Sequence, residues 1–501
     1  MRQNLKFKRA SGILLHITSL PGAYGIGEMG LEAKSFIDDL VEMNQSYWQI
    51  LPTNYPETCN SPYDTNSAFA QNPFIISLDC LVEDGLIGKQ DLGLIPKFYD
   101  RKVDFEKLKK WKYPILKKAA NNFLNNSNEE EIEKYHNFCN LQKFWLDKYA
   151  LFMVIKKLQN RSVWTDWDTG YKYQDKGAIE SININFHSEI EEIKILQYLF
   201  RRQWEALKIY ANKRGIQLIG DIPIYISLNS ADVWNNQSLF KLDQDCKMLF
   251  QSGCPPDHFM EQGQLWGHPI YNWHKHLDSK FVWWSKRINY LMEFVDIIRI
   301  DHFNGFAKYW EVPAKDLNAV NGKWVEAKGS ELLECIFEKD TKVNLIAEDL
   351  GEASADAAVI RNKFDIPGMS ILQFALFDEN PLAHIQKNTV LYTGTHDNDT
   401  SIGWFRSLED ELSKDEINNI REQLDLNSKE VNWSMIEYSF LSKAQTVIVP
   451  IQDLLGLGSE ARMNTPGTIS DTNWSWRMSA SVLTDSMKEK MKKITKKAKR
   501  I

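Results

Sequence analysis

The sequence predicts an α/β fold, an eight-stranded parallel (β/α)8 TIM barrel that carries inserted, mostly helical segments. Eight short apolar runs recur along the 501-residue chain, and amphipathic helical stretches such as 31–43 and 203–214 separate several of them. Near-continuous apolar runs are typical of strands buried on both faces, and their alternation with helices is typical of βα units. Five of the runs also end in carboxylate-bearing groups, which in such a barrel lie at the end that holds the active site.

The strands are predicted in chain order from composition and length. They are 11–20 (SGILLHITSL), 46–52 (SYWQILP), 216–226 (IQLIGDIPIYI), 295–303 (VDIIRIDHF), 343–351 (VNLIAEDLG), 369–376 (MSILQFAL), 389–397 (TVLYTGTHD) and 446–457 (TVIVPIQDLLGL). The first run follows three basic residues, as a signal peptide would, but His16 interrupts it and no small-residue cleavage site follows. It is also far shorter than the roughly 20 residues of a membrane span, so we interpret it as a strand.

Uneven spacing between the strands predicts insertions. We expect residues 1–78 to form the first part of the barrel and 202–501 its remainder. The segment 79–201 is polar, rich in Lys and Asn and helical in pattern, which favours an inserted helical subdomain over a linker. The connection 227–294 is predicted to be a long substrate loop, and a helical insertion is expected at about 402–445.

Composition excludes several classes of function. The formal net charge of −7 argues against nucleic-acid binding, which needs a basic domain or stripe, and no segment predicts contact with a membrane. The basic tail 488–500 has a helical pattern and is interpreted as a solvated helix end. The oligomeric state cannot be predicted.

Cysteine and histidine spacing predicts neither a metal nor a disulfide framework. Six cysteines are scattered without a CxxC pair, as expected for reduced thiols in a cytoplasmic protein. One local group of histidines consists of His258, His268, His274 and His276. This group lacks the i, i+4 spacing that puts two imidazoles on one helix face. We therefore expect no metal and no cofactor.

The predicted strand ends supply the candidate chemistry. Their polar groups are Asp221; Arg299 and Asp301; Glu348 and Asp349; His396, Asp397 and Asp399; and Asp453. Any one of these could be an ordinary turn or helix cap, but the carboxyl ends of barrel strands meet at one mouth, where all five groups would converge.

Arg299 and Asp301 are two residues apart on a predicted strand, so both side chains should point the same way. We expect the guanidinium to keep Asp301 ionised, whereas Glu348, close to other acids, would hold its proton. That is the division of a retaining glycosidase, in which one carboxylate attacks and the other protonates the leaving oxygen. A purely structural buried ion pair is the alternative for Arg299 and Asp301.

Two further segments, 61–73 and 253–273, mix aromatic residues with amides and carboxylates, and the chain has 17 tryptophans. This combination suits a saccharide cleft, although a large aromatic core would account for most of the tryptophans.

These residues resemble the 4-α-glucanotransferases of the amylomaltase (disproportionating enzyme) type, which are α-amylase-like barrels. The resemblance spans the chain through HITSLPGAYGIGEMG (16–30), SPYDTNSAFAQNP (61–73), GDIPIY (220–225), SADVW (230–234), PPDHFMEQGQLWG (255–267), RIDHFNGF (299–306), AEDLG (347–351), GTHDNDT (394–400), PIQDLLGLG (450–458) and NWSWR (473–477). It implies that α-1,4-glucans and maltooligosaccharides are the substrates.

The resemblance also implies roles for individual residues. Asp301 would be the nucleophile, Glu348 the general acid/base and Asp397 the third carboxylate, which grips hydroxyls of the distorted sugar. The implied substrate-binding residues are Arg299, His396, Tyr63, Ser61, Asp257, Gln264, Trp266 and Asn464. Of these, Asp257, Gln264 and Trp266 would lie on a mobile loop over the acceptor side.

The sequence departs from the family pattern at His258, at His268 and in the stretch 54–60 (NYPETCN), which lacks the usual glycines. These departures concern the outer subsites and the preferred chain length of the glucan rather than the chemistry.

Three alternatives remain at this point. GIGEMG (25–30) is a formal GxGxxG, but Pro21 and Gly22 separate it from the preceding strand, which a dinucleotide-binding site would not allow. An α-glucan hydrolase would use the same two carboxylates. A catalytically inactive glucan-binding or scaffold protein is the third, and the complete set of Asp301, Glu348 and Asp397 argues against it.

Overall fold

Eight parallel strands form the centre of the molecule in the computed structural model, which describes residues 7–57, 59–256, 260–340, 342–351, 353–426 and 430–501. These strands are β1 (Ala10–Leu14), β2 (Tyr47–Gln49), β3 (Gln217–Pro223), β6 (Ile297–Asp301), β9 (Leu345–Ala347), β10 (Gly368–Ile371), β11 (Thr389–Tyr392) and β12 (Thr446–Pro450). Each overlaps a run that the sequence predicts as a strand, and β1 and β10 begin one residue before theirs. The (β/α)8 barrel is therefore confirmed.

The barrel closes in chain order. Hydrogen-bonded neighbours follow the order β10-β11-β12-β1-β2-β3-β6-β9, and β1 pairs in register with β12 from Ala10 opposite Thr446 onward. Between β9 and β10, the Ala347 N–H donates to the Pro367 carbonyl oxygen at 2.9 Å. Because the strands are parallel and consecutive, all their carboxyl ends lie at one mouth.

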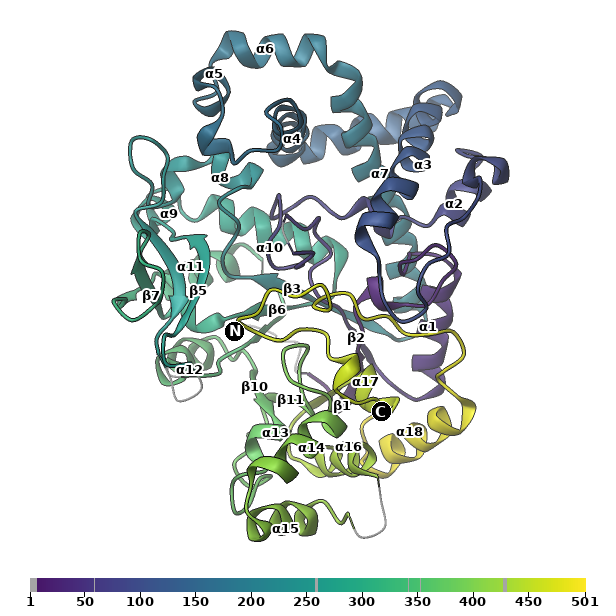
Figure 1. The fold of residues 1–501 in the computed structure, drawn as a ribbon, viewed down its shortest axis with the longest axis vertical. Coiled ribbons are helices and arrows are strands. Elements are labelled where there is room, and N and C mark those ends of the chain that lie inside the picture. The colour runs from purple at the N-terminus through teal and green to yellow at the C-terminus, as the bar shows by residue number, and fades with distance from the viewer. Residues whose placement is uncertain (1–6, 58, 257–259, 341, 352, 427–429) are drawn as a thin grey trace.

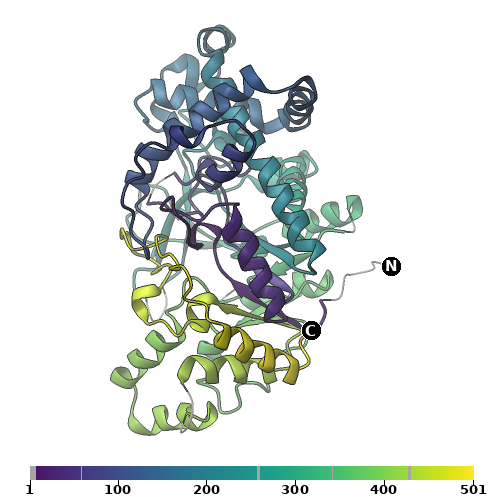
Figure 2. The ribbon, with the colours of Figure 1, turned by 90° about the vertical axis from the view of Figure 1, so that its right-hand side faces the viewer.

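Helices cover the outer wall of the barrel because each carries an apolar stripe toward the strands. Helices α1 (Leu31–Glu42), α7 (His187–Lys213) and α18 (Asp485–Lys497) lie side by side there, as Figure 2 shows. The other covering helices are α10 (Val282–Phe294), α11 (Gly329–Lys339), α12 (Ser354–Lys363), α14 (Ser401–Glu411) and α16 (Val431–Leu441).

The segment between β2 and β3 is mostly helical and lies at the top of Figure 1. It contains α2 (Leu78–Glu83), α3 (Phe105–Asn126), α4 (Glu129–Leu158), α5 (Thr169–Lys172) and α6 (Lys176–Asn185). Helix α4 packs against α7, which continues past residue 201 to cover the barrel. The boundary predicted at that residue thus falls inside one helix, and the division of the chain into domains stays a prediction.

A second, antiparallel sheet stands beside the barrel mouth, and the sequence analysis did not predict it. Its order is β5-β4-β7-β8, formed by β4 (Phe250–Cys254), β5 (Gln264–Pro269), β7 (Lys308–Pro313) and β8 (Lys323–Glu326). The short helices α8 (Ala231–Asn235) and α9 (Trp273–Asp278) precede and follow β4 and β5. The connection 227–294 is therefore not a single loop.

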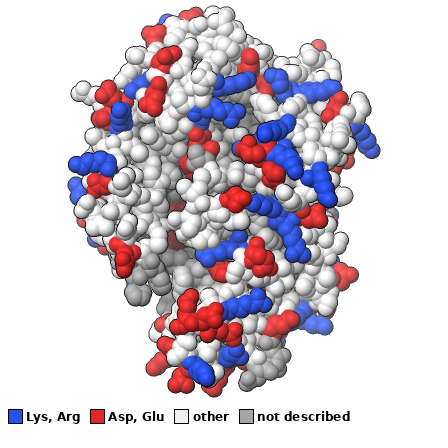
Figure 3. All heavy atoms as spheres, viewed as in Figure 1, with Lys and Arg blue, Asp and Glu red and all other residues white. Residues whose placement is uncertain are grey.

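Three more short helices occur in the last part of the chain. They are α13 (Leu372–Ala375), α15 (Lys414–Gln423) and α17 (Ile451–Leu454). Among the described residues, no helix is both long and apolar enough to cross a membrane. On the face shown in Figure 3, basic and acidic side chains are interspersed.

The basic tail differs from the sequence interpretation at its end. Helix α18 is present, but Arg500 is 0% exposed and donates to the carbonyl oxygens of Phe440, Ser442 and Ala444. The tail is therefore not a fully solvated helix end. Its last arginine ties the C-terminus to the chain between α16 and β12.

Candidate active site

Arg299 joins the two principal carboxylates at the mouth of the barrel. It lies on β6, is 1% exposed, and donates from Nη1 to Asp301 Oδ1 at 3.1 Å. Its Nη2 forms an ion pair with Glu348 Oε1 at 2.9 Å, just beyond the end of the neighbouring strand β9. The isoleucines of β6 are buried in the barrel, so the strand holds Arg299 and Asp301 at the mouth, facing the same way as predicted.

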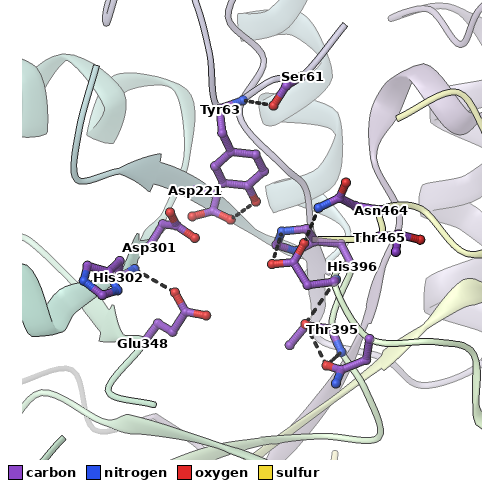
Figure 4. Close-up of polar contacts among 12 residues, drawn as sticks. Ser61, Tyr63, Asp221, Asp301, His302, Glu348, Thr395, His396, Asn464 and Thr465 are labelled. Atoms are coloured by element: carbon purple, nitrogen blue, oxygen red, sulfur yellow. Dashed lines mark hydrogen bonds and ion pairs between the residues drawn. The ribbon is translucent and has the colours of Figure 1, made fainter. Parts of the chain in front are cut away.

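Asp221 on β3 is a site residue that the sequence analysis named only as a strand end. It is paired with Arg299 in the β3–β6 register, and its Oδ2 accepts a hydrogen bond from Arg299 Nη1 at 2.6 Å. The same oxygen accepts the Tyr63 hydroxyl at 2.8 Å (Figure 4). Asp221 therefore fixes both the guanidinium and the Tyr63 ring.

The pKa values of the two carboxyl groups shift in directions opposite to the sequence expectation. Burial and the nearby charge of Glu348 raise the pKa of Asp301 well above its usual range, and Arg299 offsets this only in part. Burial also acts to raise the pKa of Glu348, but the charge of Arg299 and a hydrogen bond from the His302 N–H outweigh it and lower that pKa. The sequence led us to expect the reverse, with Asp301 ionised and Glu348 protonated, whereas Arg299 and the His302 N–H favour the ionised form of Glu348.

His302 was missed by the sequence analysis because it contributes a backbone group. Its φ and ψ are 49° and 51°, a left-handed conformation that few residues other than glycine adopt. This turn directs the His302 N–H to Glu348 Oε2 at 2.6 Å (Figure 4). No pattern of side chains in the sequence indicates such a contact.

The third carboxylate, Asp397, lies close enough to Asp301 for its charge to help raise the pKa of that carboxyl, after burial and the charge of Glu348. Asn464 donates from Nδ2 to Asp397 Oδ1 at 2.7 Å, and His396 Nε2 lies 3.4 Å from Asp397 Oδ2. The His396 ring stacks on Tyr63 with centroids 5.1 Å apart (Figure 4). The structure thus brings these predicted residues together around one space with Asp301 and Glu348.

Two residues that the sequence analysis did not single out support this side. The Arg462 guanidinium donates to the Asp397 carbonyl oxygen at 2.6 Å. The Trp474 ring lies 5.4 Å from Tyr63 and 5.8 Å from His396. Ser61, which was predicted, accepts the Tyr63 N–H through Oγ at 3.2 Å and so shapes the turn that presents the tyrosine.

The structure places Gln264 and Trp266 on strand β5 rather than on a loop, and the mobility of this segment stays a prediction. Trp266 Nε1 donates to Gln264 Oε1 at 3.2 Å, and its ring centroid lies 4.8 Å from that of His302. Trp266 is therefore close to the catalytic candidates. Asp257 and His258 lie outside the described residues. His268, the other departure, has its Nε2 3.9 Å from Asp64 Oδ1.

Three strand-end carboxylates make contacts other than those with Arg299 and Asn464, although two of them, Asp399 and Asp453, line a small pocket together with His396. Asp349 forms an ion pair with Arg361 and accepts the Met369 N–H. Asp399 accepts the Ser459 hydroxyl at 2.6 Å, and Asp453 accepts the Thr393 hydroxyl and the Ser401 N–H at the same distance. These carboxylates hold neighbouring segments together.

Glycines in GIGEMG serve packing. A Cβ on Gly27 would lie 1.9 Å from the Ile17 carbonyl oxygen, so the residue must be glycine for the two segments to touch. Within the described part of the chain, no three His, Cys, Asp or Glu side chains are grouped to hold a metal ion.

Comparison with known proteins agrees with this geometry. A family model described as 4-alpha-glucanotransferase matches residues 15–484. A 4-alpha-glucanotransferase of Synechocystis sp. is 41% identical over 487 residues, covering 95% of each chain. One from Clostridium butyricum is 42% identical over 490 residues, covering 96% of this chain and 99% of that protein.

Among solved structures, the amylomaltase from Streptococcus agalactiae in complex with acarbose is similar, with a TM-score of 0.94 and 38% identity. The match covers 98% of this chain and 100% of that one. Since the family model and the relatives extend over nearly the whole sequence, the chain belongs to the 4-alpha-glucanotransferase family.

Proposed function

We propose that this 4-alpha-glucanotransferase moves a segment of an α-1,4-glucan to the 4-hydroxyl of an acceptor glucose or glucan by a retaining double displacement. One observation carries the proposal: a single guanidinium, that of Arg299, contacts both Asp301 and Glu348 at adjacent strand ends. Retention needs two carboxyl groups at one site, one to attack and one to exchange a proton.

In the first step, Asp301 attacks the anomeric carbon, and the bond from that carbon to the glycosidic oxygen breaks. Glu348 gives its proton to the departing oxygen, and a covalent glycosyl ester remains on Asp301. In the second step, Glu348 takes the proton of the acceptor 4-hydroxyl. The acceptor oxygen then displaces Asp301 and regenerates the enzyme, so no cofactor enters the balance.

The proton that the pair shares must sit on Glu348 when the donor reacts. Two acids this close titrate together, and the contacts around each decide which one holds the proton. The His302 N–H and Arg299 both favour an ionised Glu348. We infer that Glu348 leaves at least one of these partners as it meets the glycosidic oxygen, and that the proton passes to it from Asp301.

Asp397 is assigned to the hydroxyls of the distorted donor sugar, with Asn464 and Arg462 fixing its orientation. His396 and Tyr63 form the stacked wall beside it, and Asp221 holds the tyrosine hydroxyl. Preorganised partners of this kind cost little reorganisation when charge develops on the sugar ring.

The acceptor side is assigned to β5. Trp266 offers an aromatic face close to His302, and Gln264 is fixed by its hydrogen bond to that ring. Transfer competes with attack by water, so an acceptor must be held in attacking position, where effective molarities become very high. A stacking face on a strand provides that position.

α-1,4-Glucans and maltooligosaccharides are the proposed substrates. The similar amylomaltase from Streptococcus agalactiae was solved with acarbose, which supports a glucan-like ligand for this cleft. A cytoplasmic location is proposed from the spacing of the six cysteines, which are scattered along the chain without a CxxC pair. Cell fractionation with an antibody to the chain would test the location.

Incubation with maltotriose tests the activity. We expect glucose together with a ladder of longer maltooligosaccharides, while the number of reducing ends stays nearly constant, because transfer conserves the number of chains. The products should keep the α configuration when they are observed by NMR immediately after transfer. Rising reducing ends without longer products would indicate a hydrolase instead.

A further inference from the structure

A second cavity, of about 620 Å³, lies between the helical segment and the barrel. Helices α4, α8 and α10 line it, and its lining includes the rings of Phe144, Trp145 and Trp283. None of the candidate active-site residues lines it. Its size and aromatic lining are those of a small-molecule site.

Two lysines from different helices face this cavity. Lys148 on α4 has its Nζ 5.6 Å from the Trp234 ring centroid and donates to Gln174 Oε1 at 2.7 Å. Lys286 on α10 has its Nζ 4.8 Å from the Phe144 ring centroid. Each ammonium is therefore held over an aromatic face at the edge of the same space.

Among the described residues, neither lysine has a carboxylate within ion-pair distance. Asp147, next to Lys148 in the chain, is engaged by Lys194 at 2.8 Å. Asp232 also lines the cavity, but its oxygens accept the Ala68 N–H at 2.8 Å and Trp283 Nε1 at 3.3 Å. The cavity thus has two cations on its rim, while its one buried acid is already used for internal contacts.

We propose that this cavity binds a phosphomonoester, with the phosphoryl group between Lys148 and Lys286 and the body of the molecule against the aromatic lining. Lysines are point-charge partners for phosphate, and charge-assisted hydrogen bonds to it are stronger than neutral ones. The side chains of Asn235 and Ser238, which also line the cavity, offer partners for hydroxyl groups of the ligand body. This inference concerns a site apart from the catalytic cleft and does not depend on the proposed mechanism.

The test is calorimetric titration of the full-length enzyme with inorganic phosphate, glucose 1-phosphate and adenosine monophosphate. The three probes share the phosphoryl group and differ in the body attached to it. We expect saturable binding of at least one monoester, tighter than that of inorganic phosphate and weakened by added salt because the contact is ionic. Uncharged glucose should not reproduce it.

Lys286→Gln is the decisive variant because the side chain is exposed and makes no hydrogen bond among the described residues. We expect it to weaken monoester binding about tenfold while thermal stability and basal transfer activity stay at the wild-type level. Lys143→Gln, an exposed lysine on α4 that does not line the cavity, is the matched control and should bind like the wild type.

Two results would overturn the proposal. One is the absence of saturable binding of any phosphate probe. The other is monoester binding that Lys286→Gln leaves unchanged, which would place the ligand elsewhere, for example in the catalytic cleft. Lys148→Gln should weaken binding as well, and Lys286→Gln remains informative if that variant folds poorly.

Discussion

Arg299 serves three acids at once, with nitrogen–oxygen distances of 2.6 Å to Asp221, 2.9 Å to Glu348 and 3.1 Å to Asp301. A single positive charge cannot compensate three negative charges that lie this close together, one of them on the fully buried Asp221, so ionising all three acids would be costly. The acid with the fewest donors is the one that takes up a proton. This explains why the pKa of Asp301 is raised although it lies beside an arginine.

Asp301→Asn tests the role of this residue as nucleophile. We expect transfer activity on maltotriose to fall by several orders of magnitude, because an amide cannot form the glycosyl ester. Thermal stability should change little, since the substitution keeps the shape of a group whose neutral form the site already favours. Activity and melting temperature are measured on the same preparation.

Asp399→Asn is the matched control, because Asp399 is a strand-end carboxylate that accepts the Ser459 hydroxyl and is not one of the three acids that Arg299 contacts. It should retain most of the activity. Wild-type turnover in Asp301→Asn would remove Asp301 as the nucleophile.

At this scale the sequence predicts side chains better than backbone groups. Asp301, Glu348 and Asp397 follow from strand-end carboxylates together with the family resemblance, and the structure brings them together. His302 could not be found, because its contribution is an N–H in a left-handed turn. Which of Asp301 and Glu348 holds a proton also could not be predicted, since it depends on which nitrogen of Arg299 contacts which carboxylate oxygen.

Among the secondary-structure elements, strand β5 carries the prediction about acceptor binding. Trp266→Ala should raise the ratio of hydrolysis to transfer on maltotriose, while Asp301 and Glu348 still cleave the donor. The reason is that water replaces an acceptor that is no longer held by the aromatic face. The measurement is free glucose and reducing ends released per transfer event.

Trp324→Ala is the matched control. Trp324 lies on β8 of the same antiparallel sheet, is 38% exposed, and packs against Trp310 rather than His302. It should leave the ratio unchanged. If Trp266→Ala lowers both rates equally, β5 only supports the fold and the acceptor is selected elsewhere.

The attachment of α3 to the barrel gives a prediction about pH. Glu28, ahead of α1, forms a buried ion pair with Lys112 on α3. Burial raises the pKa of Glu28 from 4.5 to about 6. The folded protein therefore binds the proton of the Glu28 carboxyl more tightly than the unfolded chain does. The stability that this protonation contributes is complete below pH 4.5 and is lost as pH rises through 6.

We expect this loss to amount to about 2 kcal/mol of unfolding free energy in the wild type and to be absent from Glu28→Gln. Urea unfolding between pH 4 and 7 measures this loss. The quantity compared is the slope of the unfolding free energy against pH, not the absolute stability of each variant. Glu83→Gln, an exposed position on α2, should keep the wild-type slope. Parallel pH profiles for wild type and Glu28→Gln would show that Glu28 does not titrate in this range.

Which elements could be predicted depends on burial. The barrel strands are apolar on both faces, so each appears in the sequence as a recognisable run. The strands β4 and β5 read FQSGC and QLWGHP, with glycines, polar residues and an irregular register between Gln251 and Gly253. These two segments show neither an alternation of apolar and polar residues nor a continuous apolar run. Their sequence is therefore typical of a loop.

On the scale of the molecule, the site is assembled only by closing the barrel. Tyr63 follows β2, Asp221 lies on β3, Asp301 on β6 and His396 after β11, yet they surround one space (Figure 4). Their separation in sequence explains why order along the chain, read with a known barrel architecture, predicts their convergence. Which strand ends instead hold structural contacts depends on partners that the sequence does not reveal.

A prediction for the whole molecule is that its transfer activity needs no metal ion. Exhaustive dialysis against a strong chelator should leave transfer on maltotriose unchanged, because the chemistry is assigned to side chains alone. The control is the same enzyme after each divalent ion is added back. Activity that disappeared on chelation and returned with one ion would contradict the assignment.

Trapping the glycosyl enzyme tests most directly whether Asp301 is the nucleophile. In Glu348→Gln, α-maltosyl fluoride can still glycosylate the nucleophile, because fluoride leaves without an acid, whereas transfer to an acceptor lacks its base and becomes slow. Proteolysis and mass spectrometry then locate the sugar. We expect a maltosyl ester on Asp301, in the peptide that contains Arg299 and His302. A stable adduct on Asp221 or Asp397, or turnover of the fluoride with no adduct on Asp301, would contradict it.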